Sequence, residues 1–134
     1  MSAIKIIRSL LVADAALIAL VPASRVVAGI PPQSMALPLI ALTEVSRVDR
    51  NLIKGSATSR STSRVQVTVM AASYPAQKTL LAAVRHAARD KVGTLSGLSD
   101  ASVHLDGTGP DFMDTDTAIY QQGQDFRVSF TETT

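Results

Sequence analysis

The residues best suited to metal chemistry are four aspartates in one short stretch, Asp106, Asp111, Asp114 and Asp116. Carboxylate oxygens are the ligands that calcium prefers. The spacing does not match the usual calcium-binding loop, however, and no glutamate closes the stretch. The sequence therefore predicts an acidic, solvent-exposed turn, and we expect neither a metal site nor a cofactor.

Other catalytic patterns are missing from the sequence. His86 falls opposite the apolar face of a predicted helix, and His104 alternates with inward-facing residues of a predicted strand, so we expect both at the surface. The glycines Gly107 and Gly109 lack the third glycine of a dinucleotide-binding loop. The sequence contains no cysteine, which excludes disulfides, thiolate metal sites and cysteine nucleophiles. We therefore expect that the protein is not an enzyme.

Charge is distributed unevenly along the chain. Residues 1–91 carry 12 lysines and arginines against four acidic residues, a net charge of +8. Residues 92–134 carry one against seven, a net charge of −6. Two interpretations are open: the opposite charges pair within one subunit, or they form unlike faces through which identical subunits attract one another.

A polar stretch between two predicted strands is rich in basic side chains, which are Arg47, Arg50, Lys54, Arg60 and Arg64. Residues 37–48 form the strand before it, and residues 63–72 form the strand after it. The two strands predict a hairpin whose extended arm covers residues 49–63. This arm could be a mobile solvated tip, a protein contact or a phosphate-binding surface. Stacking on single-stranded bases is unsupported, because no aromatic residues are interleaved with the charges.

Apolar spacing predicts the helices. Residues Ile4, Ile7, Leu11, Ala15 and Ile18 recur every three or four positions. Asp14 lies off this stripe and could cap a second short helix that runs to residue 21. Pro75 near the first helical position and Gly93 just past the end bound a later helix.

The later helix has two distinct faces. Its expected buried stripe is Leu80, Leu81, Val84, Ala87 and Ala88. Lys78, Arg85 and Arg89 lie on the other face, and we predict that Arg85 and Arg89 meet the acidic turn of a neighbouring subunit.

Strands complete the predicted fold. Residues 101–105, 117–121 and 125–131 are strand candidates, and Val65, Val67 and Val69 alternate with polar residues in the central strand. The order of elements predicts an α+β fold: an antiparallel sheet of about five to six strands with two helices on one face and an extended hairpin arm. We expect a single domain over residues 1–134. No stretch reaches the roughly 18 uncharged apolar residues of a membrane span, so no membrane partner is expected.

The arrangement resembles a known family. Residues 7–17 and 19–21 are similar to its leading helix, and residues 25–27 with Pro32, Gln33 and 37–40 resemble its first two strands and their bridging turn. The central strand feeding the helix at 80–92 comes next. Residues 109–111 with 125–130 are similar to its closing acidic turn and last strand. These features resemble the phage tail-terminator proteins, also called tail-completion or tail-to-head joining proteins, of long-tailed phages, prophages and gene transfer agents.

The resemblance implies a structural virion protein, assembled in the host cytoplasm, that forms a six-membered ring at the head-proximal end of the tail. Such a ring caps the tail tube, stops its polymerisation and contacts a head-completion or connector protein, while DNA passes through its lumen without sequence-specific binding. Leu39 departs from the family, in which an aromatic residue is expected after the proline. A head-closure protein of the same neck and a small nucleic-acid-binding protein are the alternatives.

Overall fold

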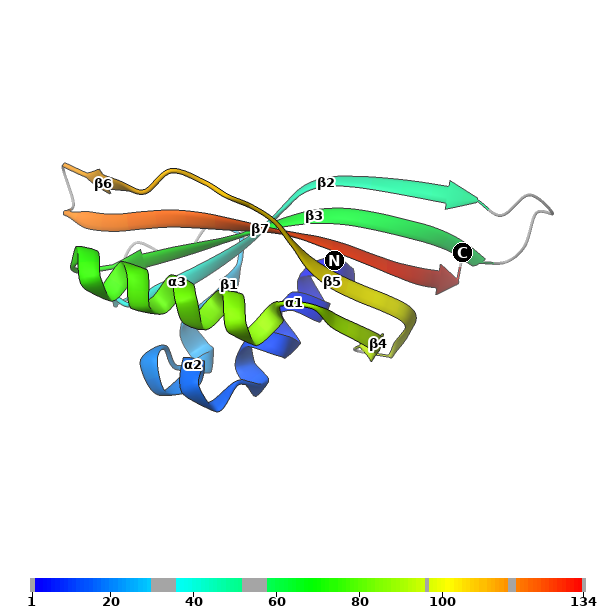
Figure 1. Ribbon diagram of the computed structural model, residues 1–134, viewed down its shortest axis with the longest axis horizontal. Coiled ribbons are helices and arrows are strands. Elements are labelled where there is room, and N and C mark those ends of the chain that lie inside the picture. The colour runs from blue at the N-terminus through cyan, green and yellow to red at the C-terminus, as the bar shows by residue number, and fades with distance from the viewer. Residues whose placement is uncertain (1, 30–35, 52–57, 96, 116–117, 134) are drawn as a thin grey trace.

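A curled sheet with helices on one of its faces makes up the protein (Figure 1). The computed structural model describes residues 2–29, 36–51, 58–95, 97–115 and 118–133. Within these ranges the helices are α1 (Ser2–Ala13), α2 (Ala15–Leu20), α3 (Tyr74–Ala88) and the short 3-10 helix Ala23–Arg25. The strands are β1 (Val26–Ala28), β2 (Leu39–Asn51), β3 (Thr58–Ala71), β4 (Lys91–Leu95), β5 (Leu98–Thr108), β6 (Phe112–Asp114) and β7 (Ile119–Thr133).

The strands are ordered β1-β2-β3-β7-β5-β4, and β6 pairs with the first residues of β7. Strand β1 is parallel to β2, and the other described pairs are antiparallel. The predicted α+β class is confirmed. The described sheet differs from the prediction in two ways: it is mixed, and it has seven strands. The parallel pairing of β1 could not be predicted, because the side-chain alternation of one strand does not encode the direction of its neighbour.

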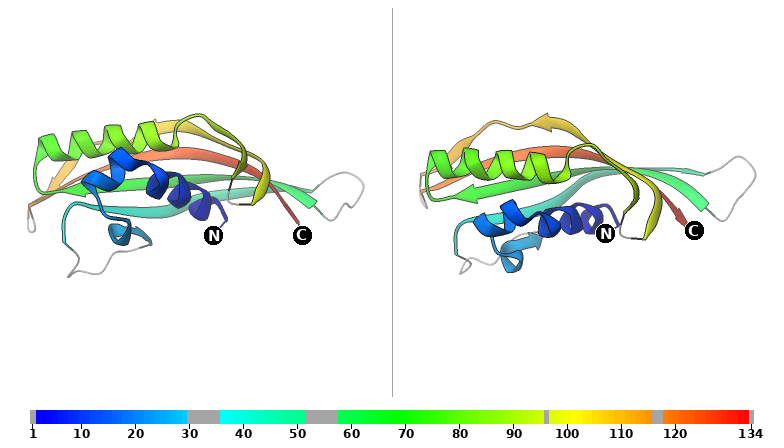
Figure 2. Two further views of the ribbon diagram at one scale, coloured as in Figure 1. Left: turned by 90° about the horizontal axis from the view of Figure 1, so that it is seen from below. Right: turned by 60° about the horizontal axis from the view of Figure 1, so that its bottom comes forward.

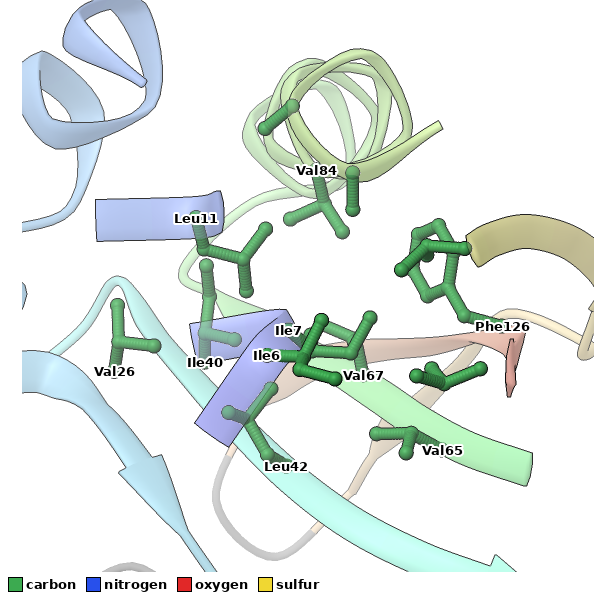
Figure 3. Packing of buried hydrophobic residues seen from close by; sticks show 14 of the residues in the cluster. Ile6, Ile7, Leu11, Val26, Ile40, Leu42, Val65, Val67, Val84 and Phe126 are labelled. Carbon is green, nitrogen blue, oxygen red and sulfur yellow. The ribbon is translucent and has the colours of Figure 1, made fainter. Parts of the chain in front are cut away.

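The three α-helices lie on the same face of the sheet and cover its central part (Figure 2). Between the helices and the sheet lies a core of aliphatic residues with two phenylalanines (Figure 3). The predicted stripe of α3 is buried in full, and Val65, Val67 and Val69 of β3 are fully buried as expected. Apolar spacing therefore identified the faces of α3 and β3 that meet the core.

The first helical segment is broken at Asp14, as the sequence suggested. The Asp14 side chain accepts a hydrogen bond from the Leu17 backbone N–H at 3.0 Å, which caps α2. The break changes the direction of the chain, so Leu17 is buried, whereas Ala15 is exposed and Ile18 is only half-buried. The predicted stripe is therefore correct in α1 and wrong in α2.

The later helix ends earlier than predicted. It stops at Ala88, because Arg89 is extended and Asp90 takes a left-handed conformation with φ 53°, which aspartate tolerates better than most residues. Gly93, expected just past the helix end, instead lies inside β4. The sequence missed β4 because its five residues carry no alternating apolar pattern.

The two strands predicted at 117–121 and 125–131 are one strand, β7. The polar residues between them suggested a break, but Gln124 is buried and satisfied within the sheet. Its side-chain amide donates to the Gly107 carbonyl at 2.9 Å, and its carbonyl accepts from the Thr108 hydroxyl at 2.6 Å. Buried glutamines therefore continue the strand where an apolar pattern is absent.

The predicted hairpin is present, and its arm is more ordered than the composition implied. Strands β2 and β3 pair as far as Asn51 and Ser59, and β7 pairs with β3 along the same length. Residues 49–51 and 58–63 of this arm belong to β2 and β3, where backbone hydrogen bonds to neighbouring strands hold them. Figure 1 shows β2, β3 and β7 continuing past the helices. Residues 52–57 lie outside the described part of the chain.

Candidate assembly surfaces

An ionic cluster lies on the face of the sheet that the helices leave uncovered. The Arg64 Nε lies 3.0 Å from Asp106 Oδ2 and 3.2 Å from Asp125 Oδ2. Arg127 stands beside Arg64 in the register of β3 and β7, and its guanidinium lies 3.5 Å from Asp106. The cluster joins the neighbouring strands β3, β7 and β5, and its two arginines are balanced by two carboxylates.

A second set of contacts fixes the acidic turn to the beginning of α3. The Lys78 Nζ donates to Asp111 Oδ2 at 2.6 Å, and the Tyr74 hydroxyl donates to the same oxygen at 2.8 Å. Lys78 also donates to Gln122 Oε1 at 2.8 Å. The Lys78 ammonium and the Tyr74 hydroxyl hold the pKa of Asp111 below its ordinary value, and Asp111 in turn raises the pKa of Lys78. Asp111 is therefore bound within its own subunit.

The end of α3 carries a different group of charges. Asp90 lies 3.1 Å from His104 Nδ1 and 3.1 Å from Arg89 Nε, and these two side chains lower the pKa of Asp90. His86 and His104 are exposed, as predicted. Arg85, one turn before Arg89, is exposed and makes no ion pair with any residue that the structure describes.

The arm places two arginines directly opposite each other. Arg50 of β2 pairs in register with Arg60 of β3, an arrangement that repels unless other groups intervene. The Arg60 guanidinium donates to the Asp100 carbonyl and to the Thr131 hydroxyl. Arg50 is exposed, and none of the described residues accepts a hydrogen bond from its guanidinium. The Ser61 hydroxyl and Arg47 hold the pKa of Asp49 low on the helix side of the arm.

The structure separates the residues that the sequence grouped as partner-binding. Those with contacts inside the chain are Arg60, Arg64, Arg89 and Asp111. Asp114 lies in β6, while Lys54 and Asp116 lie outside the described residues. The acidic turn contacts the start of α3, whereas Arg85 and Arg89 stand at its end, so these arginines and Asp111 do not meet within one subunit.

Two unpaired sheet edges are the surfaces that sequence reasoning missed. Strand β1 pairs only with the start of β2, so from Thr43 to Asn51 the described residues leave one side of β2 without a neighbour. Strand β4, at the other end of the strand order, pairs with β5 alone among the described strands. Val48 on the first edge is 58% exposed and Val92 on the second is 73% exposed. In the sequence, the signal that could have indicated these edges is a valine within an otherwise polar stretch.

A polar hollow of about 190 Å³ lies over the ionic cluster and is lined by Ser46, Val48, Thr62, Ser63, Arg64, Asp106 and Arg127, whose charges already pair with one another. An apolar hollow of about 180 Å³ between α2 and α3 is lined by Leu20, Pro38, Ala76, Thr79 and Leu80, none of which titrates. The described residues contain no group of three or more histidines and acidic side chains that could hold a metal ion. No helix in this part of the chain is long and apolar enough to cross a membrane.

Comparison with protein families gives a match over nearly the whole chain. The family model of the tail completion protein gp17 matches residues 5–131. The chain belongs to this family. A tail completion protein is a structural component of a phage tail, which places this protein in the virion.

The fold of this tail completion protein is also found in a solved virion. A chain from the virion of a native gene transfer agent particle has a TM-score of 0.75, with 20% sequence identity, and the match covers 94% of this chain and 92% of that one. At this identity the likeness shows a shared fold. Comparison with curated proteins gives no match.

Proposed function

We propose that this tail completion protein forms a ring, most simply a hexamer, at the head-proximal end of the tail tube. The ring stops polymerisation of the tube protein and provides the surface to which a head-completion or connector protein joins. The observation that carries this proposal is the family match over residues 5–131. The shared fold with a chain of a gene transfer agent virion supports it.

The physical character of the described surface agrees with an assembly role. A ring requires two unlike patches on each subunit, because every copy presents one patch to the copy before it and the other to the copy after it. The two free edges, β2 from Thr43 and β4, are unlike in length and sequence. The arginines Arg50 and Arg85 are exposed and lack an ion-pair partner among the described residues, so they are available to another chain.

A structural role also fits the arrangement of charged groups. Arg64, Asp106 and Asp125 bind one another, and Lys78 and Asp111 do the same, so these charges hold strands and turns together. We propose on this basis that the protein is not an enzyme and that it holds no metal or cofactor.

The alternatives differ in what the protein binds. A head-closure protein would bind head portals, whereas a tail terminator binds the ends of tail tubes. A nucleic-acid-binding protein would show steep salt dependence of binding. Arg60 and Arg64 of the arm are engaged within the sheet, which reduces the number of cations available to phosphates. The tail-terminator function is therefore favoured.

The test is an assembly reaction with tail tube protein in the presence and absence of this protein. We expect tubes of uncontrolled length when it is absent, and capped tubes that no longer elongate when it is added. Binding to head portals with no effect on tube growth would instead indicate the head-closure role. Absence of binding to either structure would contradict the proposed function.

A further inference from the structure

The two free edges of the sheet are matched in position. The register connects Val48 to Thr62, Thr62 to Ser129, Ser129 to Ser102, and Ser102 to Val92. One row of residues therefore crosses the five strands from edge to edge, with a valine at each end. Paired residues in antiparallel strands point to the same face, so both valines lie on the face that the helices leave uncovered.

The directions of the two edge strands are also compatible. Four antiparallel pairings separate β2 from β4, so the two strands run in the same direction. When a second copy is placed beside the first by a rotation about an axis roughly along the strands, its β2 lies parallel to the first copy's β4. A parallel ladder between them continues the sheet from one subunit into the next.

The edges lack proline, although each edge strand carries one irregularity in register, between Glu44 and Ser46 in β2 and between Gly93 and Leu95 in β4. An unpaired edge offers free N–H and C=O groups to another chain, and monomeric proteins commonly protect it with proline or with clusters of like charge. Neither Leu39–Asn51 nor Lys91–Leu95 contains proline. Charges along the first edge are balanced, Glu44 and Asp49 against Arg47 and Arg50, and Lys91 is the single charged residue of β4.

Exposed apolar side chains lie on edge strands. In the described chain the large hydrophobic residues that are exposed on strands belong to β2 beyond β1, to β4 and to β6: Val45, Val48, Val92, Phe112 and Met113. Valine favours a half-buried strand surface. Placing Val92 of a second copy beside Val48 buries part of each side chain, and the same contact recurs at every interface of a closed ring.

We propose that β4 of one copy pairs in parallel with the exposed part of β2 of the next copy, with Val92 beside Val48, so that the sheet is continuous around the ring. This inference rests on the proposed function and specifies its subunit interface. The occupant of each edge is a second copy of this chain. The interface is heterologous, because it joins two different strands of identical subunits.

The absence of cysteine from the sequence permits a specific cross-linking test. A chain carrying both Val48→Cys and Val92→Cys is assembled alone or on tail tubes, oxidised and analysed on a non-reducing gel. Neighbouring strand residues lie within the distance that a disulfide requires. We expect a ladder of covalent oligomers that ends at the ring size, and only dimers when the two single-cysteine chains are mixed before assembly.

The matched control pairs Val45→Cys with Val92→Cys. Val45 is on the same edge and is 52% exposed, close to the 58% of Val48, but it lies three residues away, about 10 Å along the strand. This pair should not form the ladder. Equal cross-linking of both pairs would mean that the register is not specific and would overturn the proposal.

Light scattering of the same samples separates this inference from the proposed function. Rings that form normally but give no Val48–Val92 disulfide would overturn the edge-to-edge interface and leave the ring intact. Unmodified protein that forms no ring, alone or on tail tubes, would contradict the proposed function and the inference with it. A disulfide ladder from assembled rings would support both.

Discussion

The part of the sheet under the helices and the arm beyond them are built on different principles. Under the helices, β3 alternates valines with polar residues, and Val65, Val67 and Val69 are removed from water. In the arm the same alternation places Ser61 and Ser63 on the helix side, both buried. The first region is stabilised by apolar burial, whereas the arm combines backbone pairing and the hydrogen bond from Ser61 to Asp49 with the buried ring of Phe130, which lies opposite Ser61. The first therefore maintains the fold, and the second with the free edges is available for assembly.

The largest effect that this comparison predicts is on the free energy of unfolding. Phe126 is fully buried beneath α3 (Figure 3), so Phe126→Ala should lower stability by about 3–5 kcal/mol. Val48→Ala on the exposed edge should change it by less than about 0.5 kcal/mol. Urea denaturation of both variants measures the difference. If both substitutions lowered the free energy of unfolding equally, the core and the exposed edge would not differ in their contribution to stability.

The next effect concerns assembly without loss of folding. Val48→Lys places a charge on the β2 edge, and Val92→Lys does the same on the β4 edge. Each variant should keep the thermal stability of the unassembled protein but remain monomeric by light scattering, because a lysine on an edge opposes strand pairing. Val48→Thr, which keeps a β-branched side chain, is the control and should retain rings. If both lysine variants formed rings, the sheet edges would not be the interface between subunits.

A smaller effect is expected from the charges that flank α3. Our proposal that Arg85 and Arg89 meet acidic residues of a neighbouring subunit predicts that changing both to Glu weakens rings, lengthens tails and leaves the monomer folded. Lysines at Asp111, Asp114 and Asp116 in the same chain should restore rings only partly, because a lysine at 111 also loses the contact with Lys78. Unchanged ring size and tail length after the arginine reversal would exclude these arginines from the interface.

The smallest effect is local and depends on pH. The pKa of Asp111 is depressed by Lys78, so this contribution to stability is present above the unfolded pKa of about 3.9 and is lost as the pH falls through the folded value. Lys78→Met should move the Asp111 pKa back toward its ordinary value. The depressed pKa of Asp90, which His104 and Arg89 control, should not move. An NMR titration of the carboxyl groups measures both, and an unchanged Asp111 would contradict the described contact.

The sequence predicted the parts of the fold that apolar patterns determine. The buried face of α3, the alternation of β3 and the cap at Asp14 all follow from local side-chain chemistry. Two features could not be predicted in this way. The helix ends at Ala88, well before Gly93, because Asp90 adopts the left-handed conformation. Strand β7 continues through Gln124 because tertiary hydrogen bonds satisfy its amide.

The candidate assembly surfaces were less accessible to sequence reasoning than the fold. Charge spacing identified Arg64 and Asp111, but these side chains serve contacts within the chain. Val48 and Val92 are separated by 44 positions in the sequence, and only the pairing of five strands shows that they occupy the same row. Surface function here depends on register between distant strands, which local patterns do not contain.

Electron cryomicroscopy of tail tubes capped by this protein would test the central claim most directly. We predict one closed ring at a single end of each tube, with β4 of every copy beside β2 of the next and Val92 next to Val48. Tubes without a ring would contradict the tail-terminator function. A ring whose subunits contact one another only through their helices, with both sheet edges free, would contradict the continuous sheet.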